Sequence, residues 1–136
     1  MASWDDVHQI AMTLPETSES LSAEETPDNW RVRGKLYAWN RPLRKGDLEA
    51  LGDRAPRGPI LAARVPDVGV KEALVADDPA VYFTTPHFTG YAVILVRLDR
   101  ISVADLRDLL VEAWLVQAPK RLAKEYLSST GQGQPS

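Results

Sequence analysis

The sequence predicts one soluble domain of the α+β class. The chain has 136 residues, of which 44% are hydrophobic and 26% charged, so it can form one core but not two of ordinary size. Helical periodicity marks the two ends of the chain, whereas segments typical of strands fill much of the middle. We therefore expect a single domain over residues 1–127. The polar end at residues 128–136 predicts a disordered tail.

A capping pattern opens the first predicted helix. Ser3 is followed three residues later by Asp6, an arrangement in which each side chain can bond the backbone N–H of the other residue. Apolar residues recur at helical spacing as far as Leu14, and Pro15 ends the helix. The acidic, hydroxyl-rich segment 16–28 predicts a loop that contains an edge strand.

The clearest strand signal is a hairpin over residues 30–39. Gly34-Lys35 fits a two-residue type II′ turn, which requires glycine in its first position. Since side chains alternate along a strand, Arg31 and Arg33 would project from one face, and four large apolar side chains would form the other face, which we assign to the core. Those four side chains belong to Trp30, Val32, Tyr37 and Trp39. The turn would give four opposed pairs: Arg33 with Leu36, Val32 with Tyr37, Arg31 with Ala38, and Trp30 with Trp39.

Glycine and proline residues separate the remaining elements of the middle region. Residues 40–59 predict a basic connection with a short helix over 47–51. The pattern then predicts, in order, a buried strand over 60–65, a short helix over 70–76, and a strand pair over 81–84 and 91–98.

The strongest helical pattern lies near the C-terminus. Ser102 is placed to cap a helix in which apolar residues recur at helical spacing from Val103 to Trp114. Pro119 ends this helix, and because proline is tolerated in a first turn it can also open a final helix over 120–127.

Composition and motifs exclude several classes of protein. The chain has no cysteine, which excludes disulfide-stapled scaffolds, thiolate metal sites and cysteine nucleophiles. Its acidic start lacks the pattern of a signal peptide, and the longest apolar run, 91–96, is far too short to cross a membrane. The motifs of phosphate loops, dinucleotide sites, hydrolase elbows and zinc proteases do not occur in the sequence. We expect a cytoplasmic protein that contacts no membrane and holds no cofactor or metal.

Charge is distributed unevenly, although the net charge is only −3. Residues 1–30 contain seven acidic residues and no Lys or Arg, whereas residues 31–64 contain nine basic and three acidic residues. A polyanion responds to the local field, so it would be drawn to the middle third. Alternatively, the acidic and basic segments lie side by side and neutralise each other. The candidate phosphate contacts are Arg31, Arg33, Lys35, Arg41, Arg44 and Lys45, with Lys120, Arg121 and Lys124 in the last helix.

His87 and Phe88 lie in the loop between the last two predicted strands. A catalytic histidine would need a group to orient its ring and donors for an oxyanion, and the sequence marks neither. Exposed loop tips on a sheet often contact partners, so His87 and Phe88 are candidate ligand contacts. An enzyme acting on a small molecule would require a pocket in which His87 meets a carboxylate such as Asp77 or Asp78.

Several segments together resemble the MmcQ/YjbR family of small bacterial proteins, over roughly residues 3–127. They are the first helix ending Leu14-Pro15, the hairpin 30–38, the segments 71–74 and 82–88, the strand 91–98 and the end 113–121. The resemblance implies a two-layer fold with helices packed on one face of an antiparallel sheet, which agrees with the order of elements. Members of this family are commonly labelled DNA-binding, and no catalytic or base-reading residue is implied.

We therefore expect a non-catalytic binding protein with weak affinity for DNA through its basic hairpin. A dedicated DNA-binding domain is usually basic, whereas the pI of this chain is near 5.4. The alternative is a protein- or peptide-interaction adaptor that uses an exposed sheet edge or an aromatic patch around Trp30, Trp39 and Phe88. A monomer is favoured.

Overall fold

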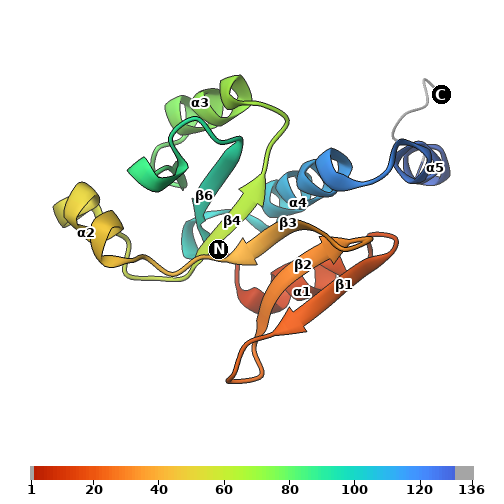
Figure 1. Cartoon of the computed structure of the whole chain (residues 1–136), viewed down its shortest axis with the longest axis horizontal. Coiled ribbons are helices and arrows are strands. Elements are labelled where there is room, and N and C mark those ends of the chain that lie inside the picture. Colours follow the sequence, from red (N-terminus) through yellow and green to blue (C-terminus); the bar gives the residue numbers. More distant parts are fainter. Residues whose placement is uncertain (1, 131–136) are drawn as a thin grey trace.

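The computed structural model describes residues 2–130 and contains one six-stranded sheet (Figure 1). Neighbouring strands are antiparallel throughout, in the order β1-β2-β3-β4-β6-β5. The strands are β1 (Thr17–Leu21), β2 (Pro27–Val32), β3 (Lys35–Asn40), β4 (Ile60–Arg64), β5 (Tyr82–Phe83) and β6 (Val93–Arg97). Together with the helices described next, this sheet confirms the α+β class.

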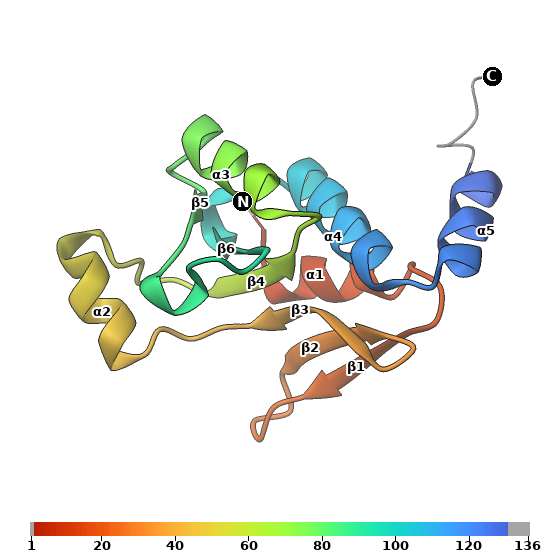
Figure 2. The same ribbon diagram turned by 45° about the horizontal axis from the view of Figure 1, so that its top comes forward.

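Helices cover the sheet mainly on one face (Figure 2). The long α4 (Val103–Gln117) contacts β3, β4 and α1 (Trp4–Ala11), and α3 (Val68–Asp77) contacts β5 and β6. At opposite ends of the molecule lie α2 (Lys45–Leu51) and α5 (Lys120–Thr130) (Figure 1). The expected two-layer arrangement is confirmed. Short 3₁₀ turns complete the fold: η1 (Gly52–Arg54), η2 (Pro86–Phe88) and η3 (Leu98–Arg100).

Side-chain caps fix the starts of α1 and α4 where the sequence predicts them. The Asp6 N–H donates to Ser3 Oγ at 3.3 Å, and the Ser3 N–H donates to Asp6 Oδ2 at 2.9 Å. The Asp105 N–H likewise donates to Ser102 Oγ at 3.1 Å. Each bond satisfies an amide that has no partner within its helix, so the capping predictions are confirmed.

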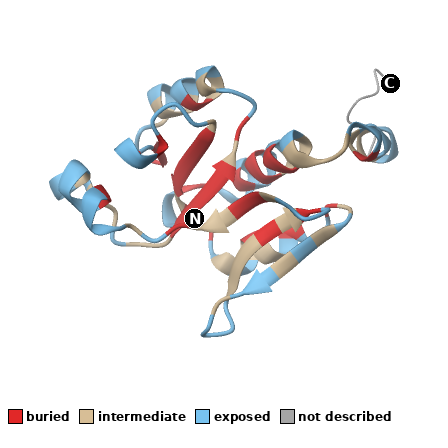
Figure 3. Cartoon of the chain, viewed as in Figure 1, coloured by how far each residue is buried: buried red, intermediate tan, exposed pale blue. Residues whose placement is uncertain are grey.

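The main hydrophobic core lies between the sheet and the helices. Trp30, Tyr37 and Trp114 are fully buried within it. Trp114 Nε1 donates to the Pro15 carbonyl oxygen at 3.0 Å, which ties α4 to the segment that follows α1. Buried positions are concentrated in β4, β6 and α4 (Figure 3).

A smaller apolar cluster occupies the opposite face of the sheet. Its buried members are Ile60, Ala62, Phe83, Phe88, Val93 and Leu95. Trp39, Leu43 and Leu51 pack against its edge. The η2 loop and the end of α2 therefore shield part of the face that the other helices leave open.

The hairpin turn is displaced by one residue from its expected position. Val32 pairs with Lys35 and Arg31 pairs with Leu36, so Arg33 and Gly34 form the two-residue turn. Their φ angles are 48° and 82°, and positive φ at both positions defines a type I′ turn, which matches the twist of the strands. The expected type II′ turn at Gly34-Lys35 and its four pairs are therefore wrong.

A β-bulge moves Trp39 to the opposite face of the sheet. The register shifts beside Trp30, which pairs with Ala38, so that Tyr37 is the extra residue in β3. A bulge restarts the alternation of side chains one residue later. Tyr37 and Ala38 consequently both join the main core, whereas Trp39 packs against the smaller cluster. The prediction that Trp39 shares a face with Trp30 is wrong for this reason.

The remaining elements follow the predicted order. The edge strand in 16–28 is β1, and β2 begins at Pro27 within the same segment. The predicted strands and short helices after the hairpin occur with shifts of one or two residues at their ends. The first helix is shorter than predicted, because α1 ends at Ala11 rather than at Leu14. The last helix is longer than predicted, because it continues to Thr130 rather than ending at Leu127. Residues 128–130, assigned by the sequence to a disordered tail, are thus helical, and 131–136 lie outside the described residues.

Candidate nucleic-acid interface

The last helix, α5, is anchored to the main core along one side and carries several basic residues. Leu122 is buried in the main core, and the ring centroid of Tyr126 lies 5.0 Å from that of Trp114. These contacts hold one side of α5 against the body of the protein. Lys120 and Lys124, one turn apart, are exposed.

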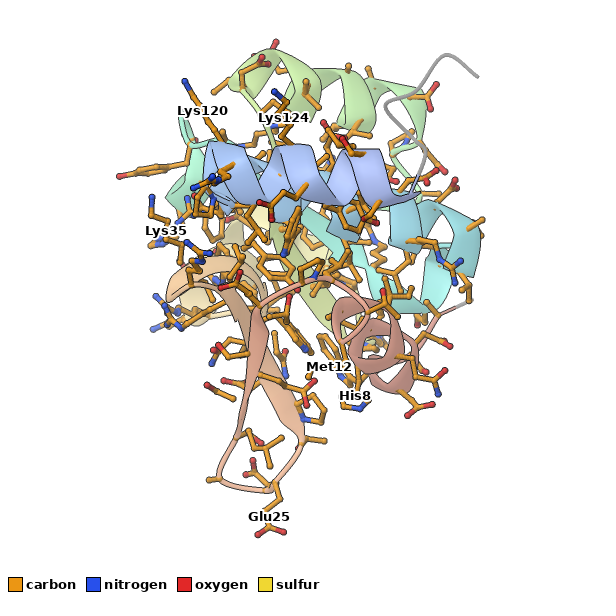
Figure 4. All side chains as sticks on the ribbon, turned by 90° about the vertical axis from the view of Figure 1, so that its right-hand side faces the viewer. His8, Met12, Glu25, Lys35, Lys120 and Lys124 are labelled. Atoms are coloured by element: carbon orange, nitrogen blue, oxygen red, sulfur yellow. The ribbon has the colours of Figure 1, made fainter. Side chains whose placement is uncertain are left out.

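The hairpin turn lies on the same side of the molecule as these lysines. Gln117 Nε2 donates to the Leu36 carbonyl oxygen at 2.8 Å, which joins the end of α4 to β3 next to the turn. Figure 4 shows Lys35 beside the end of α5 that carries Lys120, with Lys124 further along the helix. We call the basic residues of the hairpin and α5 the hairpin–helix surface: Arg31, Arg33, Lys35, Lys120, Arg121 and Lys124.

The three lysines of this surface carry uncompensated charge. None of the ion pairs formed within residues 2–130 includes Lys35, Lys120 or Lys124. An exposed ammonium group is a strongly hydrated point charge on a flexible stem. Such groups suit diffuse attraction to a polyanion better than recognition of a fixed geometry.

Arg33 is neutralised by an acidic residue of the N-terminal segment. Its Nε and Nη2 atoms donate to the two carboxylate oxygens of Glu16 at 2.7 and 2.9 Å. The hydrogen bond donated by Arg33 lowers the pKa of Glu16. The same bond and the charge of Glu16, with a smaller attraction from Glu125, raise the pKa of Arg33. The alternative prediction, in which acidic and basic segments neutralise each other, holds at Arg33.

Arg31 and Arg121 are less tightly held. Arg31 Nη1 donates to the Gly34 carbonyl oxygen at 3.3 Å across the turn. Arg121 Nε lies 3.9 Å from Glu125 Oε1 in an exposed pair one helical turn apart. Exposed pairs of this kind contribute little free energy, so Arg121 can exchange its partner for a phosphate.

Two other acidic residues of the N-terminal segment do not cover the lysines. Glu19 accepts a hydrogen bond from Trp30 Nε1 at 2.7 Å and contacts His8 Nδ1 at 2.8 Å. Glu25 lies at the tip of the β1–β2 ribbon, far from Lys35 (Figure 4). Glu16 therefore covers Arg33, whereas Glu19 and Glu25 leave the lysines uncovered.

Arg44 and Lys45 do not join the hairpin–helix surface. Arg44 precedes α2 and Lys45 begins it, at the end of the molecule away from α5 (Figure 1). Arg44 lines a cavity of about 250 Å³ together with His87. The predicted phosphate contacts thus separate into two groups, and the group at α2 is not part of one continuous interface.

Arg41 is a structural residue rather than a phosphate contact. It is buried, and its Nη2 atom lies 3.0 Å from Asp47 Oδ2. Its guanidinium carbon lies 5.2 Å from the centre of the Phe88 ring. Burial alone would raise the pKa of Asp47, but the Arg44 N–H and the charge of Arg41 lower it below its ordinary value. This buried pair explains why a basic residue occurs here without facing solvent.

The loop that carries His87 is held by a buried lysine. Lys71 Nζ donates to the carbonyl oxygens of Phe88 and Tyr91 at 2.6 and 3.0 Å, and burial lowers the pKa of Lys71. Phe88 is buried in the smaller cluster and so cannot act as a surface contact, contrary to the prediction. His87 is exposed, with its ring edge-on to Phe88 at 4.8 Å between centroids.

Two further sites considered from the sequence are not assembled as expected. Trp30 and Phe88 are both buried, which removes the aromatic patch predicted around them. His87 lies at the cavity near α2, whereas Asp77 and Asp78 line a separate cavity of about 350 Å³ next to α4. The pairing of His87 with either carboxylate is therefore not formed.

Within residues 2–130, no three His, Cys, Asp or Glu side chains are grouped so that they could hold a metal ion. Nor does this part of the chain contain a helix with the length and apolar character needed to span a membrane.

A second basic group was not predicted from the sequence. Arg54, Arg57, Arg97 and Arg100 line a cavity of about 350 Å³. The two pairs of arginines are distant in the sequence and form no local motif. Predicting this group would require knowing that β4 pairs with β6, because the cavity forms where those strands meet.

The sheet and its helices define a small domain of the α+β class. The YjbR family model matches residues 12–116, and the chain belongs to this family. The resemblance noted in the sequence is thereby confirmed.

Two relatives and one solved structure extend this assignment. Uncharacterized protein Rv2570 of Mycobacterium tuberculosis and Uncharacterized protein Mb2600 of Mycobacterium bovis are each 55% identical over 134 residues, covering 96% of this chain and 100% of the relative. The crystal structure of Deinococcus radiodurans protein DR2400, family-model domain DUF419, matches with a TM-score of 0.62 and 19% identity, over 96% of this chain and 89% of that chain. At that identity the structural match shows the fold alone.

Proposed function

We propose that this protein is a non-catalytic, cytoplasmic binding protein that attaches weakly to the DNA backbone through the hairpin–helix surface. The observation that carries the proposal is that Lys35, Lys120 and Lys124 project at one end of the molecule without an ion-pair partner in residues 2–130. The DNA-binding label implied by the family resemblance points in the same direction.

Weak, sequence-independent binding follows from the charges. The net charge of −3 and pI near 5.4 oppose the approach of a polyanion, so attraction depends on the local field of the lysines. Three or four phosphate contacts give a slope of about −2.7 to −3.6 for the logarithm of the association constant against the logarithm of salt concentration. Contacts to phosphate carry no sequence information.

A fluorescence-polarisation titration with labelled duplex DNA tests the proposal. We expect saturable binding at about 20 mM salt that is almost lost at about 150 mM, because released counterions drive the association. Absence of binding at the lower salt concentration would remove DNA as the ligand.

A matched pair of charge reversals tests the surface itself. Lys35→Glu should weaken DNA binding by about 5- to 10-fold, since it replaces an attraction to phosphate with a repulsion. Lys45→Glu makes the same change in net charge on α2 and should alter the affinity by less than about twofold. Equal weakening by both variants would mean that total charge, rather than this surface, governs binding.

Within residues 2–130, β1 is an edge strand of the sheet, which favours the adaptor as a second candidate function. In the sheet, β1 pairs with β2 on one side, and Leu21 at its end is 55% exposed. An edge strand offers unpaired backbone groups to another strand. Light scattering over a concentration series tests self-pairing: a dimer abolished by Leu21→Lys supports it, whereas a monomer at every concentration excludes it.

A further inference from the structure

Four arginines from distant segments meet where β4 begins and β6 ends. Arg54 and Arg57 belong to the segment before β4, and Arg97 and Arg100 belong to the end of β6 and the η3 turn. The antiparallel pair of Ile60 with Arg97 brings the two segments together. We call the space that they enclose, about 350 Å³ and also lined by Asp99, the arginine cavity.

Arg97 is fixed on the wall of this cavity. Its Nη1 atom donates to the Pro79 carbonyl oxygen at 3.1 Å, and its Nη2 atom donates to the Arg54 carbonyl oxygen at 3.3 Å. Its guanidinium carbon lies 4.5 Å from the centre of the Phe83 ring, which is itself buried. A planar group held in this way loses little conformational freedom when a ligand binds.

The charge in the cavity is unbalanced. Four arginines and one carboxylate, that of Asp99, leave a local formal charge of +3. No ion pair within residues 2–130 includes any of these five residues. Burial lowers the pKa of Arg97, and the nearby charge of Arg100 lowers it further. The charge of Asp99 raises the pKa, and Arg54 has a smaller lowering effect. A bound anion would relieve this repulsion.

We propose that the arginine cavity binds the phosphoryl group of a small molecule, as a phosphate ester or a diphosphate. Guanidinium groups match phosphate oxygens in bidentate geometry, and several arginines together suit a ligand with two or more negative charges. The volume of the cavity lies at the lower end of the range for small-molecule sites.

The arginine cavity is distinct from the hairpin–helix surface. β3 runs from Lys35, at that surface, to Asn40, which pairs with Leu61 beside the cavity. Six extended residues span roughly 17–20 Å, so a small ligand cannot reach both places. The proposal therefore goes beyond the attachment to DNA and can fail independently of it.

Isothermal titration calorimetry with pyrophosphate at low salt tests the proposal. We expect saturable binding of one pyrophosphate, weakened at least tenfold by the double variant Arg57→Gln/Arg100→Gln. The control Lys45→Gln/Arg107→Gln removes the same charge elsewhere and should leave the affinity within about twofold. No saturable binding, or equal weakening in both double variants, would overturn the proposal.

Two further measurements test the site. The first distinguishes a small phosphate ligand from DNA, and the second uses the unmodified protein, so it does not require a variant to fold. Lys35→Glu should leave pyrophosphate affinity unchanged, whereas displacement of pyrophosphate by duplex DNA would make the cavity part of a nucleic-acid surface and overturn a small-molecule site. In the unmodified protein, pyrophosphate should shift the amide NMR signals of residues 54–58 and 97–100. Signals that stay in place there would exclude binding in the cavity.

Discussion

The hairpin–helix surface and the arginine cavity are both basic, but they hold their charges in different ways. Lys35, Lys120 and Lys124 project into solvent without an ion-pair partner in residues 2–130. Arg97 is fixed by two carbonyl oxygens and an aromatic ring. Flexible lysines bind most favourably to a ligand with many phosphates and no fixed geometry, whereas a fixed guanidinium binds most favourably to a single anion of defined shape.

The contrast shows that formal charge alone does not identify a binding site. Arg33 belongs to the hairpin–helix surface, yet its guanidinium already donates hydrogen bonds to Glu16. Arg41 is as basic as any arginine of the cavity, yet it is buried with Asp47. The position of each partner decides whether a basic residue serves the fold or a ligand.

The largest expected effect concerns Arg41, which belongs to neither region. Arg41→Met should lower the free energy of unfolding by about 3–5 kcal/mol, because it leaves the buried Asp47 carboxylate without its partner. Urea denaturation measures this change, and affinities for DNA and pyrophosphate should stay within about twofold at temperatures where the variant is folded. A loss of less than about 1 kcal/mol, or a selective loss of binding, would contradict the structural role of Arg41.

The anchoring of α5 gives the next largest effect and separates the two regions. Leu122→Ala should lower the free energy of unfolding by about 2–4 kcal/mol, because it leaves a cavity in the main core. It should also weaken DNA binding, since α5 carries half of the hairpin–helix surface, while pyrophosphate binding remains. Val116→Ala, at a half-exposed position of α4, is the matched control with a change below about 1 kcal/mol. Equal effects of the two substitutions would argue against the anchoring of α5 by Leu122.

Salt dependence sharpens the comparison without any substitution. Raising salt from about 50 to 150 mM should reduce DNA affinity by about 20- to 50-fold, as expected for three or four phosphate contacts. Pyrophosphate binding should fall along a shallower slope, because partly buried charges are screened less than exposed ones. Polarisation and calorimetry over the same salt series give both slopes, and identical slopes would remove the distinction between the regions.

The smallest expected effect concerns Arg33, the arginine of the hairpin–helix surface that is paired with Glu16. Glu16→Gln should raise DNA affinity by about 2- to 5-fold, because it frees Arg33 for one more phosphate contact. Polarisation titrations measure the change. Unchanged or weaker binding would show that Arg33 does not face the DNA.

The pH dependence of Glu16 provides an independent check. Since Arg33 lowers the pKa of Glu16 in the folded protein, the bond stabilises the fold above the ordinary pKa near 4.5 and is lost as pH falls through the lowered value. The difference in urea midpoint between the unmodified protein and Glu16→Gln should be constant above about pH 5 and shrink below about pH 4. A difference that persists at lower pH would mean that the ion pair is not its cause.

Local signals predicted most of the fold because each depends on neighbouring residues. Ser3 with Asp6 and Ser102 with Asp105 fix helix starts within one turn, so the sequence contains all that these caps require. The hairpin turn was misplaced because Gly34 satisfies both a type II′ turn that it opens and a type I′ turn that it closes. The bulge at Tyr37 depends on packing against the core, which the hairpin residues alone do not specify.

The candidate site depended more heavily on distant contacts. The bases of the hairpin and the last helix were identified, but their placement at one end depends on contacts such as that between Gln117 and Leu36. Burial of Phe88 follows from the smaller cluster and from the bond that Lys71 makes to the loop. The arginine cavity exists because β4 pairs with β6, and a single sequence does not state which strands are neighbours.

The central claim is that two separate regions of this protein bind different anions. Amide NMR spectra of the unmodified protein, titrated in parallel with duplex DNA and with pyrophosphate, test it directly. DNA should shift the signals of residues 33–36 and 120–125, whereas pyrophosphate should shift those of residues 54–58 and 97–100. Shifts of a single shared set of residues by both ligands, or of neither set by either ligand, would contradict the claim.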